Sequence, residues 1–274
     1  MSLRWNSFAQ AKAKSISPEN IGAMKNRTVF ITGASAGIGR AAAVRFHQAG
    51  ARVVAVARRA ERLKELEQQL GSERCFPLVL DITDAAATES ALKELPAAFS
   101  EISVLVNNAG CAVGMEPIWE ADLDDWETML SLNIKALLRV TRWILPQMVA
   151  RDQGHIINLG SVAGRYAYRG GHVYGASKAF VEQFSHNLRC DLLGKRVRVT
   201  NIEPGLVETE FSLRRFRGDQ DQADSVYAGI EAMTAEDIAE AIVWSASVPE
   251  RMNINRIEMM ATMQASGGFA FHRE

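Results

Sequence analysis

The sequence lacks long apolar runs and is poor in cysteine, and each deficit excludes a class of protein. No stretch approaches the roughly 18 consecutive apolar residues of a membrane-spanning helix, so no membrane partner is expected. The three cysteines are widely spaced without a CxxC pattern, and the histidines have no metal-like spacing. A disulfide framework and a metal site are therefore not expected, whereas a reducing, cytoplasmic location is.

An excess of charge of either sign is missing as well. The chain has 31 Lys+Arg against 32 Asp+Glu, which gives a formal net charge of -1. A nucleic-acid partner would need a basic field, and a solvating tail would need an acidic block. A small-molecule partner is the better expectation, and no nucleic acid is expected to bind.

The beginning of the chain differs from the rest in composition. Residues 1–24 are basic but contain no continuous apolar segment, which argues against a secretory signal. We expect an arm over residues 1–24, either flexible or part of an oligomer contact, ahead of one domain over residues 25–274. No repeat, low-complexity tract or Pro/Gly linker divides that domain.

Short apolar runs alternate with longer helical patterns from residue 28 onwards. Pro146 lies inside one such pattern and predicts a kink or a helix end near Leu145. Strands alternating with helices predict an α/β fold, a doubly wound parallel sheet flanked by helices on both faces. Strands are predicted at 28–32, 52–56, 104–106, 155–159, 197–202 and 254–260, the last before a loose C-terminal tail, and helices at 40–49, 61–70, 84–95, 125–150, 174–193 and 234–246.

A glycine-rich turn follows the first predicted strand and opens the first helix. Its glycines allow the backbone to turn sharply and to approach a pyrophosphate closely. The free N–H groups and the dipole at the helix N-terminus also favour the anion. Glycines alone are equally compatible with an ordinary tight turn. The residues predicted to contact the phosphates are Gly33, Ser35, Ala36, Gly37, Ile38 and Gly39.

The end of the second predicted strand discriminates between dinucleotides. NAD-binding folds usually place a carboxylate there to accept from the ribose 2′-hydroxyl. Here the strand continues into Arg58 and Arg59, whose guanidinium groups can pair with a 2′-phosphate. NADP(H) is therefore the predicted cofactor, and a solvated basic turn is the alternative.

A tyrosine, a lysine and a serine form a candidate catalytic group. Tyr174 and Lys178 lie at i and i+4, on one face of a predicted helix. We expect the Lys178 ammonium to lower the pKa of Tyr174, so that the phenol can exchange a proton with an alcohol or carbonyl oxygen. Ser161 follows a predicted strand and could hydrogen-bond the same oxygen. Without the serine, the Tyr–Lys pair would suggest no more than a surface contact.

Taken in order, these motifs resemble the short-chain dehydrogenase/reductase family from about residue 25 to the C-terminus. The resemblance implies a single-domain Rossmann fold, an oxidoreductase acting on CH–OH groups, and a homotetramer whose contacts use the helices at 125–150 and 174–193. Ala136 and Gly160 depart from the family pattern, where glycine and serine respectively are frequent. The matched motifs are Thr32-Gly33-x-x-x-Gly37-Ile38-Gly39, Asn107-Asn108-Ala109-Gly110, Asn133, Ser161, Tyr174 with Lys178, and Pro204-Gly205.

The resemblance also implies a role for each matched residue. Tyr174 would be the general acid/base and Ser161 the partner of the substrate oxygen. Lys178 would lower the Tyr174 pKa and bind ribose, while Asn133 would hold a helix distortion and a water molecule. Further cofactor contacts would come from Asp81 and Ile82 at the adenine, from Asn107, Asn108, Ala109 and Gly110 at the adenosine half, and from Pro204, Gly205, Val207 and Thr209 at the nicotinamide.

Four short segments narrow the substrate class. Residues 170–175, 178–181, 202–211 and 253–260 resemble the NADP-dependent 3-hydroxy acid dehydrogenases, a subgroup similar to serine and allo-threonine dehydrogenases and malonic semialdehyde reductases. This implies serine, allo-threonine, 3-hydroxyisobutyrate, 3-hydroxypropionate or the corresponding carbonyl compounds as substrates. Their carboxylate needs a cation, for which Arg215 is the first candidate and Arg165 and Arg169 are rivals.

Two other functions remain open on the sequence. A generic NADP-dependent carbonyl reductase for uncharged ketones or polyols would have an uncharged pocket. A non-catalytic, NADP(H)-sensing regulatory protein would keep the fold and lose the chemistry. The second is disfavoured because a degenerate enzyme usually loses at least one catalytic group, and this chain retains Asn133, Ser161, Tyr174 and Lys178.

Overall fold

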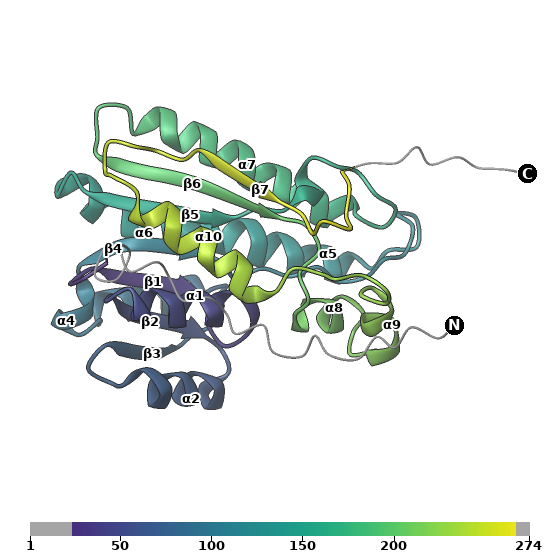
Figure 1. The fold of residues 1–274 in the computed structure, drawn as a ribbon, viewed down its shortest axis with the longest axis horizontal. Coiled ribbons are helices and arrows are strands. Elements are labelled where there is room, and N and C mark those ends of the chain that lie inside the picture. The colour runs from purple at the N-terminus through teal and green to yellow at the C-terminus, as the bar shows by residue number, and fades with distance from the viewer. Residues whose placement is uncertain (1–23, 267–274) are drawn as a thin grey trace, which may run out of the picture.

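The computed structural model describes residues 24–266, and a central parallel sheet organises them (Figure 1). The strand order is β3-β2-β1-β4-β5-β6-β7, and every neighbouring pair is parallel. The predicted doubly wound α/β fold is therefore confirmed. The strands are β1 (Thr28–Thr32), β2 (Arg52–Ala57), β3 (Cys75–Val79), β4 (Ile102–Asn107), β5 (Gly154–Leu159), β6 (Val197–Pro204) and β7 (Arg256–Met259).

Helices cover both faces of the sheet, because successive strand side chains point to opposite sides. In β1, Val29 and Ile31 join the core beneath α1, α2 and α10, whereas Phe30 joins the core beneath α4, α6 and α7. The helices are α1 (Gly37–Gln48), α2 (Ala60–Leu70), α3 (Ala85–Lys93), α4 (Ala97–Ser100), α5 (Leu123–Leu130), α6 (Leu137–Ala150), α7 (His172–Asp191), α8 (Glu210–Arg215), α9 (Gln220–Ser225) and α10 (Ala235–Ser247).

One local prediction is corrected. Of the predicted kink or helix end near Leu145, the helix end is wrong, because α6 contains Pro146 and continues to Ala150. Packing of Val140, Ile144 and Met148 against the sheet offsets the hydrogen bond that proline cannot donate. The irregularity lies upstream instead, where residues 131–136 form a π-helical segment between α5 and α6.

Strand β3 was not predicted from the sequence. It is short and contains Pro77, which usually argues against a strand. Among the strands of residues 24–266, β3 pairs only with β2, and proline is tolerated at such a sheet edge because one side of the strand has no ladder to complete.

The described region begins at Met24, which is fully buried and donates its backbone N–H to Ala49. The predicted arm, apart from Met24, and the predicted C-terminal tail beyond residue 266 lie outside the described residues. Within residues 24–266 no helix combines the length and apolarity needed to cross a membrane. The same region contains no cluster of three or more His, Cys, Asp or Glu side chains arranged to hold a metal ion.

Candidate active site

A large cleft opens at the carboxyl ends of the parallel strands, the usual ligand position in open α/β sheets. Its volume is about 1310 Å³, which leaves room for a dinucleotide together with a small second molecule. The lining comes from the β1–α1 turn, the ends of β2, β4, β5 and β6, the first half of α7, and α8.

The β1–α1 turn has the backbone that an anion site requires. Gly33 and Gly37 have φ values of +71° and +50°, a region that disfavours side chains. A Cβ at Gly33 would lie 2.8 Å from the side-chain nitrogen of Asn108. Ala36 precedes α1 and offers no side-chain cap, so the first N–H groups of the helix stay available to a ligand.

Gly39 belongs to the same motif but does not line the cleft. A Cβ there would lie 2.4 Å from the carbonyl oxygen of Gly33, so the glycine allows the turn to pack on α1. Gly39 thus has a packing role in the turn, and its predicted contact with the cofactor stays a prediction. Gly33, Ser35, Ala36, Gly37 and Ile38 all line the cleft.

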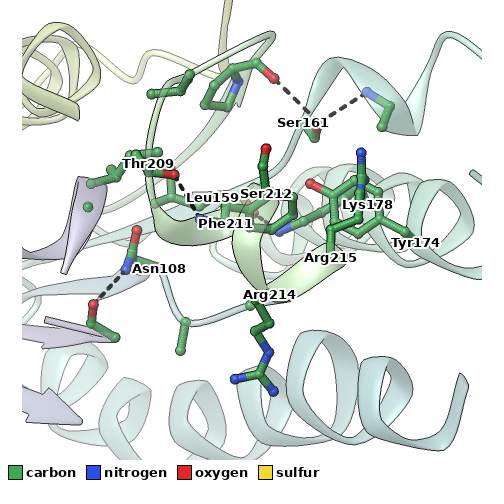
Figure 2. A pocket seen from close by; sticks show the side chains of 18 of the residues that line it. Asn108, Leu159, Ser161, Tyr174, Lys178, Thr209, Phe211, Ser212, Arg214 and Arg215 are labelled. Carbon is green, nitrogen blue, oxygen red and sulfur yellow. Dashed lines mark hydrogen bonds between the residues drawn. The ribbon is translucent and has the colours of Figure 1, made fainter. Parts of the chain in front are cut away.

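The two asparagines at the end of β4 point in different directions. Asn108 donates to the carbonyl oxygens of Thr32 at 2.9 Å and of Gly33 at 3.3 Å, which ties the β4 end to the glycine-rich turn (Figure 2). Asn107 instead donates to Thr141 and Asn158, both at 2.9 Å, and is absent from the cleft lining. The prediction that Asn107 lines the adenosine half fails for its side chain, whereas Asn108, Ala109 and Gly110 do line the cleft.

The end of β2 presents cations to the cleft, as predicted. Arg58 pairs with Asp81 at 3.4 Å. Arg59 donates to Ser35 Oγ at 3.1 Å and pairs with Glu210 of α8 at 2.7 Å. Both arginines and their three partners line the cleft together with Ile82, so this end is polar and exposed enough to exchange these ion pairs for a ligand phosphate.

The predicted catalytic side chains lie together at the other end of the cleft (Figure 2). Ser161 accepts from the Ala163 N–H at 3.1 Å, which starts a 3-10 turn at Val162–Gly164, and donates to the Pro204 carbonyl oxygen at 3.3 Å. Lys178 Nζ donates to the Leu159 carbonyl oxygen at 2.7 Å and lies 5.8 Å from the Tyr174 ring centroid. The backbone thus fixes the serine and the lysine around the phenol.

Burial changes the predicted acidity of Tyr174. Desolvation raises the pKa of Tyr174 to about 12 and outweighs the lowering by Ser161 and by the Arg215 guanidinium. Desolvation also lowers the pKa of Lys178 to about 8. The predicted depression of the Tyr174 pKa is therefore wrong for this structure, because both groups are buried away from water, which penalises their charged forms.

Asn133 explains the irregular helix between α5 and α6. Its side chain accepts from the Cys111 N–H at 2.9 Å and donates to the Cys111 carbonyl oxygen at 2.8 Å and to Ser177 Oγ at 3.0 Å. These bonds tie the π-helical segment to the chain after Gly110 and to α7. Asn133 is buried behind the cleft and does not line it, so its predicted water contact stays a prediction.

Arg215 lies beside the phenol in a cage of aromatic rings. Its guanidinium carbon is 5.1 Å from the Tyr174 ring centroid, 5.4 Å from that of Phe211 and 5.7 Å from that of Tyr168. Nη2 donates to the Tyr168 hydroxyl at 2.9 Å, whereas the buried Nε has no hydrogen-bond partner among the described residues. A buried donor without a partner is costly, so this geometry favours an anionic ligand at Arg215.

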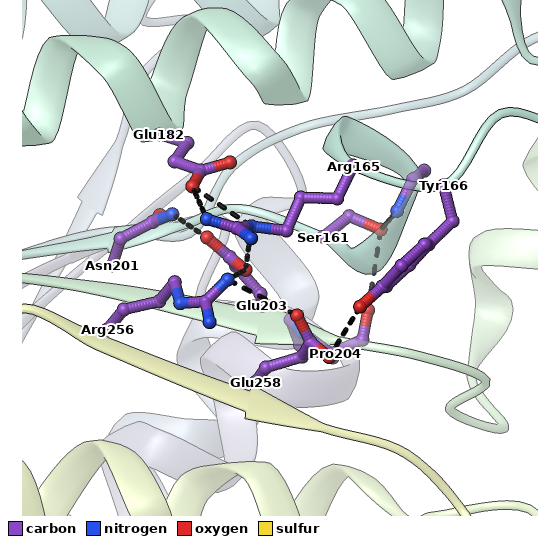
Figure 3. A network of polar contacts seen from close by, with 10 residues as sticks. Ser161, Arg165, Tyr166, Glu182, Asn201, Glu203, Pro204, Arg256 and Glu258 are labelled. Carbon is purple, nitrogen blue, oxygen red and sulfur yellow. Dashed lines mark hydrogen bonds and ion pairs between the residues drawn. The ribbon is translucent and has the colours of Figure 1, made fainter. Parts of the chain in front are cut away.

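The rival arginines differ in their surroundings. Arg169 lines the cleft and is exposed. Arg165 does not line the cleft, and it forms ion pairs with Glu182 and, at 3.6 Å, with Glu203 (Figure 3). Arg214, next to Arg215, lines the cleft but points away from Tyr174 (Figure 2). Of these arginines, Arg215 is therefore the best placed to bind a substrate carboxylate next to Tyr174.

Sequence reasoning missed the residues that support these side chains. Tyr168 and Phe211 form the cage around Arg215, and Gln264 accepts from the Leu206 N–H at 2.7 Å. The aromatic residues beside Ser161 and Arg215 were a usable signal, but no sequence pattern predicts Gln264. The residues predicted at the nicotinamide, Pro204, Gly205, Val207 and Thr209, all line the cleft.

Comparison with known proteins agrees with this geometry. The NADP-dependent 3-hydroxy acid dehydrogenase of Escherichia coli K12 is 51% identical over 247 residues, which cover 90% of this chain and 99% of the relative. Sulfoacetaldehyde reductase 2 of Chromohalobacter salexigens is 50% identical over 248 residues, which cover 90% and 98% respectively. A closed form of serine dehydrogenase complexed with NADP+ matches with a TM-score of 0.88 and 51% identity, covering 90% of this chain and 100% of that one.

The family model described as short chain dehydrogenase matches residues 27–220, which is more than half of the chain. The glycine-rich turn and the Ser161, Tyr174 and Lys178 group line one cleft of the seven-stranded parallel sheet. The chain belongs to the short-chain dehydrogenase family.

Proposed function

We propose that this chain is an NADP(H)-dependent oxidoreductase that interconverts a short 3-hydroxy acid and its carbonyl counterpart. The observation that carries this proposal is the Arg215 guanidinium, held 5.1 Å from the Tyr174 ring with a buried Nε that lacks a partner in the described region. A carboxylate at Arg215 and a reacting oxygen at Tyr174 would be separated by only a few bonds. This spacing suits a short acid better than an uncharged ketone.

The residues of the cleft fit NADP(H). The Gly33–Gly37 turn and the uncapped start of α1 would hold the pyrophosphate, and Arg58 and Arg59 the 2′-phosphate. Asp81 and Ile82 would contact the adenine, and the Pro204–Thr209 segment the nicotinamide. When bound, NADP(H) supplies or accepts the hydride.

The chain's own side chains would handle the proton. Since burial keeps Tyr174 protonated at neutral pH, its hydroxyl can donate a proton to a carbonyl oxygen during reduction. Ser161 would hold that oxygen in place. Lys178, with a pKa of about 8, is still cationic at neutral pH and stabilises the phenolate left behind. Alcohol oxidation would use the same groups in reverse.

A substrate panel tests the proposal. The panel compares uncharged alcohols with hydroxy acids of similar size, namely L-serine, allo-threonine, 3-hydroxyisobutyrate and 3-hydroxypropionate. The kcat/KM for NADP+ reduction, measured from the absorbance of NADPH, should be higher with the acids. A preference for the uncharged compounds would favour a generic carbonyl reductase. Absence of turnover with every compound would leave only a cofactor-binding role.

The enzyme should prefer NADP(H) over NAD(H) by at least about tenfold in kcat/KM, equivalent to ~1.4 kcal/mol. The reason is the pair of guanidinium groups at the end of β2, where an NAD-specific site would place a carboxylate. Arg58→Asp should erode the preference by repelling the 2′-phosphate. Steady-state kinetics with both cofactors measure it.

Lys64→Asp is the matched control, since Lys64 lies on the exposed side of the adjacent α2 and does not line the cleft. It makes the same change in net charge as Arg58→Asp and should leave the cofactor preference unchanged. Equal use of NAD(H) and NADP(H) by the unmodified enzyme would contradict the assignment of Arg58 and Arg59.

We further propose a homotetramer in the cytoplasm. Support for the assembly is the stacked pair Phe180 and Phe184 on α7, with ring centroids 6.0 Å apart and Phe180 exposed. Support for the location is that Cys75, Cys111 and Cys190 are unpaired thiols. Light scattering should give four times the chain mass of 30.1 kDa, and Phe180→Asp should lower it.

A further inference from the structure

A buried carboxylate lies directly behind the catalytic serine. Glu203 is the residue before Pro204 in β6, and only 1% of its surface is exposed. Its partners are Asn201 Nδ2 at 2.6 Å, Arg256 Nη1 at 3.4 Å and Arg165 Nε at 3.6 Å. A buried carboxylate is stable only with such partners, so its presence here requires the two arginines.

The two arginines extend this contact into a network of five charged side chains (Figure 3). Arg165 also donates to Glu182 of α7, and Arg256 also contacts Glu258 of β7 at 3.3 Å. Tyr166, which lines the cleft, donates to Glu258 at 3.1 Å. The network therefore joins the segment after β5, the end of β6, β7 and α7.

Those segments carry the candidate catalytic groups. Ser161 begins the turn that leads to Arg165, and its hydroxyl donates to the carbonyl oxygen of Pro204, the residue after Glu203. α7 carries Tyr174 and Lys178 as well as Glu182. Glu203 thus anchors both the chain that bears the serine and the carbonyl group that the serine contacts.

Gly160 shows how closely the network approaches the serine. A Cβ at this position would lie 2.7 Å from Asn201 Oδ1 and 3.1 Å from Glu203 Cγ. The glycine that replaces the frequent family serine is therefore explained by the side chains packed beneath it. Even one methyl group there would have to displace the network or the turn.

We propose that Glu203 is a positioning residue, which holds the Ser161 turn in its reactive place through Arg165 and Arg256. The proposal rests on the proposed oxidoreductase activity, since Ser161 matters only if the chain is an enzyme. Glu203 touches neither the cleft nor the reacting atoms, so it acts through its neighbours.

The charge balance makes this anchor sensitive to pH. Three carboxylates, on Glu182, Glu203 and Glu258, face two guanidinium groups, on Arg165 and Arg256, with the Tyr166 hydroxyl beside them. Burial, and next the Glu182 carboxylate, raise the pKa of Glu203 to about 7, against the pull of Arg256 and Arg165. The ionised form of Glu203 forms the ion pairs with Arg165 and Arg256. These ion pairs are therefore fully formed above that pH and weaken below it.

The first test is Glu203→Gln, which keeps the shape and removes the charge. In full-length enzyme, kcat for NADPH oxidation should fall about tenfold or more, since small misplacements of reacting groups can cost up to ~10²-fold. The NADPH dissociation constant should stay unchanged. The wild-type decline in kcat as pH falls through about 7 should be absent from the variant.

Three further variants separate positioning from folding. Glu203→Asp keeps the charge, so its kcat should be higher than that of Glu203→Gln. Its kcat should also decline below about pH 7, as in the wild-type enzyme. Gly160→Ala displaces the network without changing charge, so kcat should fall while the decline remains. Glu250→Gln removes a carboxylate that pairs with Arg27 and Gln153 away from the cleft, and it should change neither readout.

Wild-type kcat in Glu203→Gln would overturn the inference. So would parallel losses of kcat, NADPH affinity and melting temperature with an unchanged pH profile, because that pattern indicates a purely structural role. If Glu203→Gln does not fold, Glu203→Asp and Gly160→Ala decide by the same readouts. Lack of turnover by the wild-type enzyme would instead defeat the proposed function.

Discussion

Replacing Tyr174 by phenylalanine should reduce turnover by roughly 10²-fold or more, the usual scale of general acid/base catalysis. The substitution keeps the ring that packs against Phe211, with centroids 5.6 Å apart, and deletes only the hydroxyl. Burial holds that hydroxyl in its protonated form at neutral pH, so the substitution removes the proposed proton donor. NADPH affinity, measured by fluorescence titration, should survive.

Tyr227→Phe makes the same chemical change in the same cleft and serves as the control. The Tyr227 hydroxyl donates to the Val207 carbonyl oxygen at 3.1 Å and contacts Ser212, so its loss removes supporting hydrogen bonds rather than a reacting group. A fall of about fivefold at most is expected, the scale of one neutral hydrogen bond. Undiminished turnover in Tyr174→Phe would mean that another group carries the proton.

Arg215→Leu should separate acidic substrates from uncharged ones. Truncating one partner of a buried charge pair costs on the order of 2–5 kcal/mol, or roughly 30-fold to a few thousand-fold in kcat/KM for a 3-hydroxy acid. An uncharged substrate of similar size does not use the pair, so its kcat/KM should be nearly unchanged. General destabilisation would depress both substrates alike.

The control for Arg215→Leu is Arg169→Leu, which removes an exposed arginine from the same cleft. It should have little selective effect on acids. If Arg215→Leu shows no selectivity and Arg169→Leu does, the carboxylate site moves to Arg169. If neither variant discriminates, and Arg165→Leu also fails to do so, the hydroxy-acid assignment is wrong.

Most of the fold was predictable because local patterns and tertiary structure agree. The runs of β1, β2, β4, β5 and β6 are buried on both faces, so each reads as a short, largely apolar run between helical patterns, which predicts a strand of a parallel sheet. β3 was missed, and a helix end was one of the two outcomes predicted near Leu145, because the local preference of proline does not reveal the packing that outweighs it.

The candidate site was predictable in its residues but not in its energetics. Sequence spacing brings Tyr174 and Lys178 together, yet it does not reveal that desolvation dominates their pKa values. Likewise, the sequence does not distinguish the adjacent Asn107 and Asn108. In the structure the Asn107 side chain faces the interior, whereas the Asn108 side chain faces the glycine-rich turn. Arg165 looked available for a substrate because its partner Glu203 lies distant in sequence.

The π-helical segment at Ser131–Ala136 has a consequence for engineering this enzyme. A stretch of helix that departs from regular α geometry is less stable than a regular helix. A designer could therefore stabilise the protein by idealising the backbone there. Here the irregular turn lets Asn133 reach Cys111 on one side and Ser177 on the other. A thermostabilised variant with a straightened helix would gain robustness at the expense of that support behind Lys178, so this segment should be exempt from such designs.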